Sequence, residues 1–439
     1  MTLKKALVWR VLAVMLAVTL IAASCGDDED GTGTTAAPED TTAPETTAAA
    51  PEETTTTAAD EVIVTQEGDL LDTVLARGDL HCGVSGSAVA FSETQPDGSQ
   101  TGFDADYCRA VAAALFGDAN AVEFTPLTAA ERFTAVQTGE VDVLMRNTTW
   151  TQSRDTEVGM DFGPTTYYDG QQLMARESAG FSGASQVVDI AGAVVCTNAG
   201  TTTEQNIADA ADAAGISIQL TTFEDFDQVT ENFINGACDV ITTDGSALVG
   251  RKANQQPAGE NWVIFPATPI SKEPLGPTYG QNQSRFADVV NWTVYATIIA
   301  DEKGITSANV DAMAANPPDA EAARLLGAAD DEQQSNMGLA PDAFYQVIAQ
   351  VGNYDEIYAR HLNPVGLTRE GSANAGWLDT SWSPDGAFLT VGYGRPFPVC
   401  DDYEPPFEAP EGLASLVIET GPLPPFDFDA EMAHAMRHQ

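Results

Sequence analysis

Between residues 80 and 145, short apolar segments alternate with amphipathic ones. Residues 81–84 predict a strand, and residues 103–116 predict a helix because apolar side chains at positions 103, 107, 111, 114 and 115 share one helical face. Thr128 and Glu131 have capping-box spacing, so a second helix is expected to begin there and to end at Gly139. The apolar residues 141–145 predict the next strand.

The same alternation returns further along the chain. Strands are expected at residues 192–197, 217–220 and 238–243, with helices at 203–214 and 224–235. Strands that alternate with helices indicate an α/β fold on mainly parallel sheets, and two such blocks indicate two lobes. Residues 285–350 are largely helical in pattern, with an N-cap candidate at Thr306 or Ser307 and a break at Pro317 and Pro318.

The N-terminus has the pattern of an export signal. Basic residues at positions 4, 5 and 10 precede an apolar segment, 11–23, that is too short for a comfortable membrane span. Ser24 and Cys25 follow, and then a run of acidic residues. We therefore expect residues 1–24 to be a lipoprotein signal peptide and Cys25 to carry the lipid; a plain signal peptide with a chance cysteine is the alternative.

Composition changes sharply on either side of the globular pattern. Residues 31–60 hold eleven Thr, eight Ala and three Pro, so residues 25–67 are expected to form a disordered tether. Residues 395–439 form an acidic, proline-rich tail to which we assign no role. Against 65 Asp and Glu the chain has only 19 Lys and Arg, and its formal charge of -46 argues against nucleic-acid binding.

Five cysteines remain after Cys25, in a compartment where disulfides form. Cys82 lies on the first expected strand and Cys108 on the helix that should pack beside it, while Cys196 and Cys238 lie on two strands of the second block. Pairing within each block predicts Cys82–Cys108 and Cys196–Cys238 and leaves Cys400 unpaired. No CxxC sequence exists and the four histidines show no ligand spacing, so no metal site is expected.

Polar residues follow four of the expected strands, where ligands bind in open α/β sheets. The candidates are Ser85 and Phe91 after the first strand; Asn147, Thr149 and Arg154 after the second; Gly200, Thr201 and Thr202 after the third; and Asp244 after the fourth. An arginine fork, helix N–H groups and a lone carboxylate together suit a zwitterion. The alternative is that each of these residues only stabilises the fold, because Thr and Asp at helix starts are usually N-caps.

Several long strings of residues carry a family resemblance. Between residues 68 and 394 the chain resembles extracellular solute-binding proteins of the polar-amino-acid ABC-transporter family, above all the general L-amino-acid-binding branch. The matching segments are 71–74, 77–78, 102–111, 127–133, 139–155, 167–170, 200–204, 238–240, 242–244, 270–277 and 350–354.

The resemblance implies a two-lobed, type II periplasmic-binding-protein (Venus-flytrap) fold with two hinge strands. Lobe 1 would combine residues 68–170 with 268–394, and lobe 2 would be residues 171–267. Arg154 would bind the ligand α-carboxylate, helped by Thr149 and by Gly200, Thr201 and Thr202, and Asp244 would take the α-ammonium. Ala88 and Val89 stand where many relatives have an aromatic side chain, which leaves the side-chain preference open.

The resemblance therefore implies a monomeric, cofactor-free protein that delivers L-amino acids to an ABC permease. The N-terminal pattern predicts that a lipid on Cys25 anchors it outside the membrane. Two alternatives remain. A sensor would report amino acids to a membrane partner through the extra tail. An enzyme such as a dehydratase would need a general acid or base, and no histidine lies in the four cleft loops, although Glu93 and Glu204 remain candidate acids.

Overall fold

The computed structural model describes residues 69–329, 333–375, 380–382 and 388–390. All of them belong to one compact unit, Val64–Gln439. The expected signal peptide, Cys25, the tether, the tail and Cys400 lie outside the described residues. Among those described, no helix combines the length and the apolar character that a membrane crossing needs.

The first of two five-stranded sheets has the order β5-β1-β6-β15-β7. Its strands are β1 (Leu80–Val84), β5 (Val122–Pro126), β6 (Val143–Leu144), β7 (Met160–Phe162) and β15 (Thr278–Gly280). β1 runs parallel to β5 and β6, whereas β15 runs antiparallel to β6 and β7. We call the region built on this sheet the first lobe.

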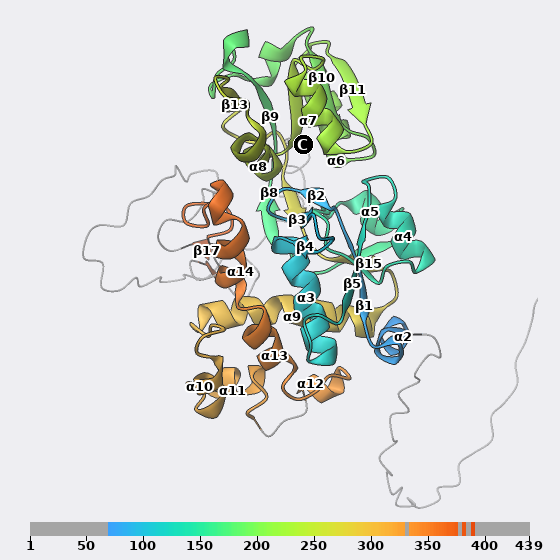
Figure 1. The fold of residues 1–439 in the computed structure, drawn as a ribbon, viewed down its shortest axis with the longest axis vertical. Coiled ribbons are helices and arrows are strands. Elements are labelled where there is room, and N and C mark those ends of the chain that lie inside the picture. The colour runs from blue at the N-terminus through green and yellow to red at the C-terminus, as the bar shows by residue number, and fades with distance from the viewer. Residues whose placement is uncertain (1–68, 330–332, 376–379, 383–387, 391–439) are drawn as a thin grey trace, which may run out of the picture. The chain divides into compact units, whose positions relative to one another are not determined.

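The second sheet has the order β11-β10-β12-β9-β13. Its strands are β9 (Gln171–Arg176), β10 (Val194–Asn198), β11 (Gln219–Phe223), β12 (Val240–Asp244) and β13 (Trp262–Phe265). β10 is parallel to β11 and β12, and β9 is antiparallel to β12 and β13. We call this region the second lobe; it carries α6 (Thr202–Ala213), α7 (Phe226–Ile234) and α8 (Gly245–Gln255) (Figure 1).

Two small sheets matter for the site. β8 (Tyr167–Asp169) pairs with β14 (Glu273–Leu275), next to the two points where the chain passes between the lobes. A small sheet of β2 (Ser87–Ala88), β3 (Ser92–Thr94) and β4 (Gln100–Thr101) follows β1. A further pair, β16 (Thr380–Trp382) with β17 (Phe388–Thr390), lies near the end of the described chain.

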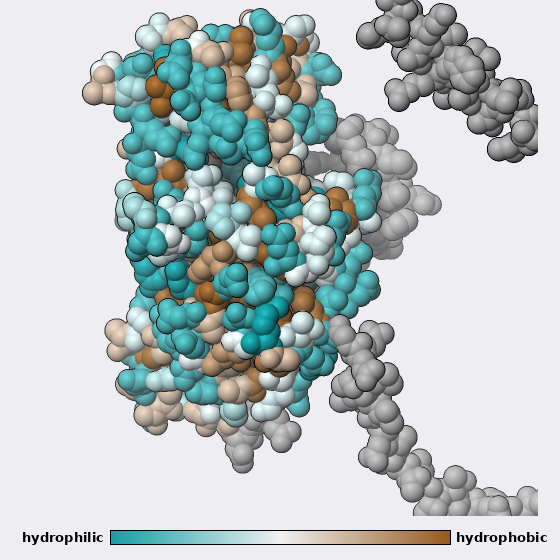
Figure 2. Space-filling model, turned by 45° about the vertical axis from the view of Figure 1, so that its right-hand side comes forward, coloured by the Kyte–Doolittle hydropathy of each residue, from teal (hydrophilic) through white to brown (hydrophobic). Residues whose placement is uncertain are grey.

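Helices complete the first lobe, and its largest core forms around α3 (Phe103–Phe116), which contacts β1, α9, α13 and α14. Gly102, at φ 132°, precedes α3, and nearly every residue of the helix is buried. The remaining helices of this lobe are α2 (Leu70–Arg77), α4 (Arg132–Thr138), α5 (Gln152–Thr156), α9 (Ser284–Glu302), α10 (Val310–Ala315), α11 (Ala320–Leu325), α12 (Gln333–Asn336), α13 (Ala343–Gln350) and α14 (Tyr354–His361). On the face drawn in Figure 2, hydrophobic residues are scattered among hydrophilic ones.

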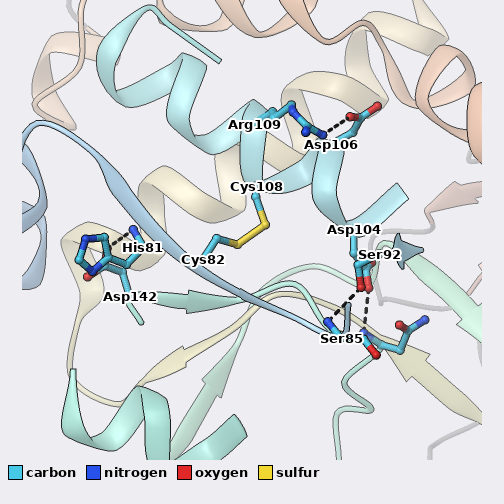
Figure 3. The surroundings of a disulfide bond; sticks show 10 residues. His81, Cys82, Ser85, Ser92, Asp104, Asp106, Cys108, Arg109 and Asp142 are labelled. Carbon is cyan, nitrogen blue, oxygen red and sulfur yellow. Dashed lines mark hydrogen bonds and ion pairs between the residues drawn. A yellow bond between two sulfur atoms is a disulfide. The ribbon is translucent and has the colours of Figure 1, made fainter. Parts of the chain in front are cut away.

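The structure contains both disulfides expected from the sequence. Cys82–Cys108 joins β1 to α3, as Figure 3 shows, and its Cα atoms are 6.1 Å apart. Cys196–Cys238 joins β10 to the turn before β12, with Cα atoms 5.9 Å apart. Each bridge closes a loop inside one lobe, which restricts the unfolded chain without linking the lobes.

Three expectations need correction. The sheets are mixed rather than mainly parallel, because β9 and β15 enter directly from the connections between the lobes and not through a crossover helix. The strand expected at 141–145 is reduced to Val143–Leu144. The helix expected to begin near Thr306 or Ser307 is regular only from Val310. A turn precedes it, in which the Thr306 carbonyl accepts from the N–H groups of Asn309 and Val310 and the Thr306 N–H donates to Asn309 Oδ1 at 2.7 Å.

Candidate functional site

A cavity of about 250 Å³ lies beyond the carboxyl ends of the parallel strands and is lined from both lobes. Eight of the nine ligand-binding candidates line it: Ser85, Phe91, Asn147, Thr149, Arg154, Thr201, Thr202 and Asp244. Gly200 does not; its N–H donates to Glu204 Oε2 at 2.8 Å, next to the cavity. The convergence follows from topology, since the carboxyl ends of parallel strands share one edge of a sheet.

Arg154 is the best-prepared anion ligand in the cavity. Thr151 caps the short helix α5, which holds Arg154 in its first turn. Nη1 donates to the Thr149 carbonyl at 2.8 Å, and the guanidinium carbon lies 5.3 Å from the centre of the Phe133 ring. No other hydrogen bond of this side chain occurs within the described residues, so most of its five N–H donors are available to a carboxylate. Burial lowers the pKa of Arg154.

Asp244 is the corresponding carboxylate of the second lobe. It ends β12, only 9% of it is exposed, and its Oδ1 has no hydrogen-bond partner within the described residues. Burial raises the pKa of Asp244 well above its usual value, and the neighbouring carboxylates of Asp169 and Glu273 raise it further. A buried carboxyl group in this state gains most from a cation that reaches it.

Asp169 and Glu273 were not selected from the sequence. Asp169 accepts from the Gly170 N–H at 2.8 Å and is hydrogen-bonded to Ser246 Oγ, while burial raises its pKa to about 6. Glu273 accepts from Thr202 Oγ1 at 3.1 Å and from Asn206 Nδ2 at 2.8 Å. Both carboxylates thus connect the β8–β14 pair to helices of the second lobe, a role that no local sequence pattern reveals.

The hydroxyl groups of the α6 start are largely engaged by the protein itself. Thr201 Oγ1 donates to the Asn198 carbonyl at 2.8 Å and accepts from the Glu204 N–H at 3.1 Å, so it is the N-cap. Thr202 Oγ1 donates to Glu273. Both threonine side chains therefore stabilise the protein rather than remain available to a ligand. What α6 offers the cavity is its N-terminal backbone N–H groups.

The first-lobe candidates differ in what they offer. No hydrogen bond of Thr149 Oγ1 occurs within the described residues, and Asn147 Oδ1 is buried without a partner. The N–H of Ser85 donates to Ser92 Oγ at 3.0 Å, close to Asp104 (Figure 3). Phe91 is 1% exposed and packs edge-on against Phe103 and Tyr167. Phe91 therefore supports the cavity wall more than it covers a ligand.

Three further arginines line the cavity, and sequence reasoning gave none of them a role. Arg146 donates from Nε to the Leu127 carbonyl at 2.9 Å, and burial lowers its pKa to about 10. Arg251 on α8 donates from Nη2 to the Ser87 carbonyl at 2.8 Å and so connects the lobes across the cavity. Arg132 on α4 is 2% exposed.

The sequence from residue 80 to residue 364 matches the family model of bacterial extracellular solute-binding proteins, family 3. The chain belongs to this family. Among its relatives, the general L-amino acid-binding periplasmic protein AapJ of Rhizobium johnstonii is 42% identical over 311 residues, 70% of this chain and 89% of AapJ. The glutamate/glutamine/aspartate/asparagine-binding protein BztA of Rhodobacter capsulatus is 41% identical over 310 residues, again 70% and 89%.

A solved structure extends the comparison to three dimensions. An ABC transporter/periplasmic binding protein from Brucella ovis, with glutathione bound, is 46% identical and has a TM-score of 0.64 over 68% of this chain and 92% of its own. These similarities confirm the two-lobed periplasmic-binding-protein fold of this solute-binding protein. The boundaries between its lobes at residues 170/171 and 267/268 stay a prediction.

One side-chain cluster of the solute-binding protein lies apart from the cavity. Asp79, His81 and Glu123 bring their ligand atoms within 4.8 Å of one another at the β1–β5 edge. The spacing of histidines along the chain could not reveal it, because Glu123 comes from the neighbouring strand, in register with His81. Arg77 Nε donates to Asp79 at 2.8 Å, so one of the two carboxylates of this cluster already has a cationic partner.

Proposed function

We propose that this protein captures L-amino acids outside the membrane and delivers them to the permease of an ABC transporter. The carrying observation is that Arg154 and Asp244 line one cavity from opposite lobes, each with hydrogen-bonding capacity that the protein does not use. An α-carboxylate on Arg154 and an α-ammonium on Asp244 would bridge the lobes and stabilise the closed arrangement.

Two further features support a zwitterionic ligand. The free hydroxyl of Thr149 and the N–H groups at the start of α6 add donors for the carboxylate. Asp244 gains a cationic partner, which relieves its repulsion by Asp169 and Glu273. Gly200 retains a supporting part only, as the residue that leads the chain into α6 at φ +71°.

A second candidate ligand is glutathione or a related γ-glutamyl peptide. The Brucella ovis relative was solved with glutathione bound, at a higher identity than that of AapJ or BztA. The γ-glutamyl end of glutathione carries a free α-carboxylate and α-ammonium, so Arg154 and Asp244 suit it equally. The two ligands differ in how far they extend beyond this end.

We propose further that the protein is exported through residues 1–24, anchored by a lipid on Cys25 and monomeric. The support is the sequence pattern of the N-terminus, together with a family named for extracellular proteins. A sensor that reports amino acids through residues 395–439 is the alternative within the binding class. An enzyme is disfavoured because the relatives are named as binding proteins and the candidate acids Glu93 and Glu204 are not among the described cavity-lining residues.

A ligand panel tests the proposal. Thermal unfolding of the purified protein should shift upward with several polar L-amino acids and little with their D-forms, because a mirror-image ligand cannot satisfy both charges and the side-chain space together. Glutathione, sugars and simple dicarboxylates complete the panel. A response to sugars or dicarboxylates alone would contradict the proposal, and mass spectrometry of ligand retained through native purification gives an independent answer.

A further inference from the structure

Three metal-ligating side chains meet at the end of the first sheet that lies away from the cavity. Asp79 and His81 are two residues apart in the extended chain that enters β1, so their side chains lie on the same face of the strand. Glu123 is the register partner of His81 in the parallel β1–β5 pair and shares that face. The ligand atoms of all three residues lie within 4.8 Å of one another. The cluster is near the amino ends of β1 and β5, whereas the cavity lies beyond their carboxyl ends.

The distances within the cluster resemble those between ligands around an ion. His81 Nε2 lies 3.4 Å from Glu123 Oε2 and 3.7 Å from Asp79 Oδ1. A hydrogen bond from a ring N–H to a carboxylate is normally about 2.7–3.2 Å long, and the His81 ring makes none within the described residues. Nitrogen and oxygen ligands about 2.0–2.2 Å from a tetrahedral Zn²⁺ are about 3.3–3.5 Å apart.

Two further residues hold the ligands in place. Arg77 donates from Nε to Asp79 Oδ1 at 2.8 Å and from Nη2 to the Asp79 carbonyl at 2.9 Å. The same guanidinium pairs with Asp142, which is only 2% exposed and accepts from the backbone N–H of His81 at 2.8 Å (Figure 3). Such partners orient the ligands of a metal site. Glu123, with a side chain that is 66% exposed, has room to move toward an ion.

The charges of this region favour a cation despite the presence of Arg77. Three carboxylates, those of Asp79, Glu123 and Asp142, face the single guanidinium group of Arg77. The formal charge of -46 on the whole chain adds a long-range attraction for cations.

We propose that Asp79, His81 and Glu123 form a binding site for a divalent transition-metal ion, with Zn²⁺ as the best fit. One imidazole nitrogen and two carboxylate oxygens suit Zn²⁺ and its neighbours in the first transition series, whereas Ca²⁺ and Mg²⁺ prefer oxygen ligands alone. The spacing of histidines along the chain gives no sign of this site, because strand pairing brings Glu123 to it. A bound ion would join the edge strand β5 to β1 and so stabilise the first lobe.

Calorimetric titration of the full mature protein with Zn²⁺ tests the proposal. The protein carries no histidine tag, is first freed of metal by a chelator, and is titrated in excess Mg²⁺, which occupies non-specific carboxylates. The wild type should bind Zn²⁺ saturably, and its unfolding temperature should rise with Zn²⁺. Asp79→Asn, His81→Gln and Glu123→Gln should each weaken Zn²⁺ binding by at least about tenfold, because each removes one ligand.

Matched variants identify binding at other places. Glu231→Gln removes an exposed carboxylate from α7 in the second lobe and should leave Zn²⁺ affinity unchanged. Joint replacement of His434 and His438, which lie outside the described residues, should also leave it unchanged. Loss of Zn²⁺ binding in that double variant together with retention in His81→Gln would overturn the proposal. Absence of saturable binding by the wild type would overturn it as well, and would leave the cluster as a surface ion pair.

Two measurements keep the test decisive. If His81→Gln does not fold, the exposed Glu123 still provides a variant: the visible absorption of Co²⁺ bound in place of Zn²⁺ should be lost in Glu123→Gln, and an unchanged spectrum would refute the assignment. Binding of L-amino acids by Glu123→Gln should equal that of the wild type, because none of the three ligands lines the cavity. The metal site and the proposed function can therefore fail independently of each other.

Discussion

Replacement of Asp244 by Asn should weaken ligand binding and stabilise the ligand-free protein. The substitution keeps the size of the side chain but removes the charge that the ligand ammonium is proposed to meet. In the ligand-free protein the same charge faces Asp169 and Glu273, which raise the pKa of Asp244 after burial has already done so. The Asn side chain is free of that repulsion.

The magnitudes follow from burial. Because Asp244 is only 9% exposed, loss of the pair should cost about 2–5 kcal/mol, or roughly 30- to several-thousand-fold in affinity. Ligand binding lowers the pKa of Asp244, so the complex holds fewer protons than the free protein. Below the pKa that Asp244 has in the ligand-free protein, wild-type affinity should therefore fall by up to about tenfold for each pH unit. The Asp244→Asn variant should lose this dependence.

The pH dependence of folding stability has the opposite sign to that of ligand affinity. A carboxyl whose folded-state pKa is raised takes up a proton more readily in the folded than in the unfolded state. The free energy of unfolding of the wild type therefore falls as pH rises from the unfolded-state pKa of about 4 through the raised folded-state value. At pH 7.5 the ligand-free Asp244→Asn protein should accordingly unfold at a higher temperature than the wild type.

Calorimetric titration between pH 5.5 and 8.5, together with thermal unfolding of the ligand-free proteins, measures both effects. Arg154 and Arg132, which lower the Asp244 pKa, are unchanged in the variant. Binding by Asp244→Asn within about threefold of wild type, a difference of only ~0.7 kcal/mol, would show that the ammonium is held elsewhere. A lower unfolding temperature of the ligand-free variant would show that the repulsion argument is wrong.

Three further predictions concern other parts of the chain. Arg154→Ala should abolish micromolar binding in calorimetric titration, whereas Arg109→Ala, outside the cavity, should bind nearly normally; equal losses would refute the assignment. Cys25→Ser should release the protein into the medium with its binding intact, and retention of the mutant in membranes would contradict lipid anchoring. Gly102→Ala should destabilise the fold by about 1–3 kcal/mol, because a Cβ would lie 2.2 Å from the Phe91 carbonyl oxygen at φ +132°; an unchanged unfolding temperature would argue against it.

The parallel part of each sheet could be predicted because its pattern is local. A strand of apolar residues and the helix after it are read from neighbouring positions, as at Phe103–Phe116, where prediction and structure coincide. The strand ends then identify the residues that line the cavity. Element boundaries followed from the sequence only to within a few residues, as at α10, where a turn from Thr306 precedes the regular helix.

The candidate site was found from the sequence as a set of residues, but not as a set of contacts. The sequence identified Thr201 and Thr202 without deciding between ligand binding and capping. In the structure both hydroxyl groups make hydrogen bonds within the protein, Thr201 with the Glu204 N–H and Thr202 with Glu273. Arg132 was part of a matching string, but its burial on the cavity wall, with no hydrogen-bond partner for Nε within the described residues, depends on how distant elements pack around it. Absence of a partner is a property of the whole fold.

The sequence by itself therefore determined the α/β class, the two blocks, the disulfide partners and the strand-end residues, because all of these depend on periodicity and on neighbours within one block. Tertiary structure alone decided that β9 and β15 enter their sheets antiparallel, and that Asp169 and Glu273 reach helices of the second lobe. These features join segments that lie far apart in the chain. Their geometry depends on how separately folded elements pack, which no local pattern of side chains encodes.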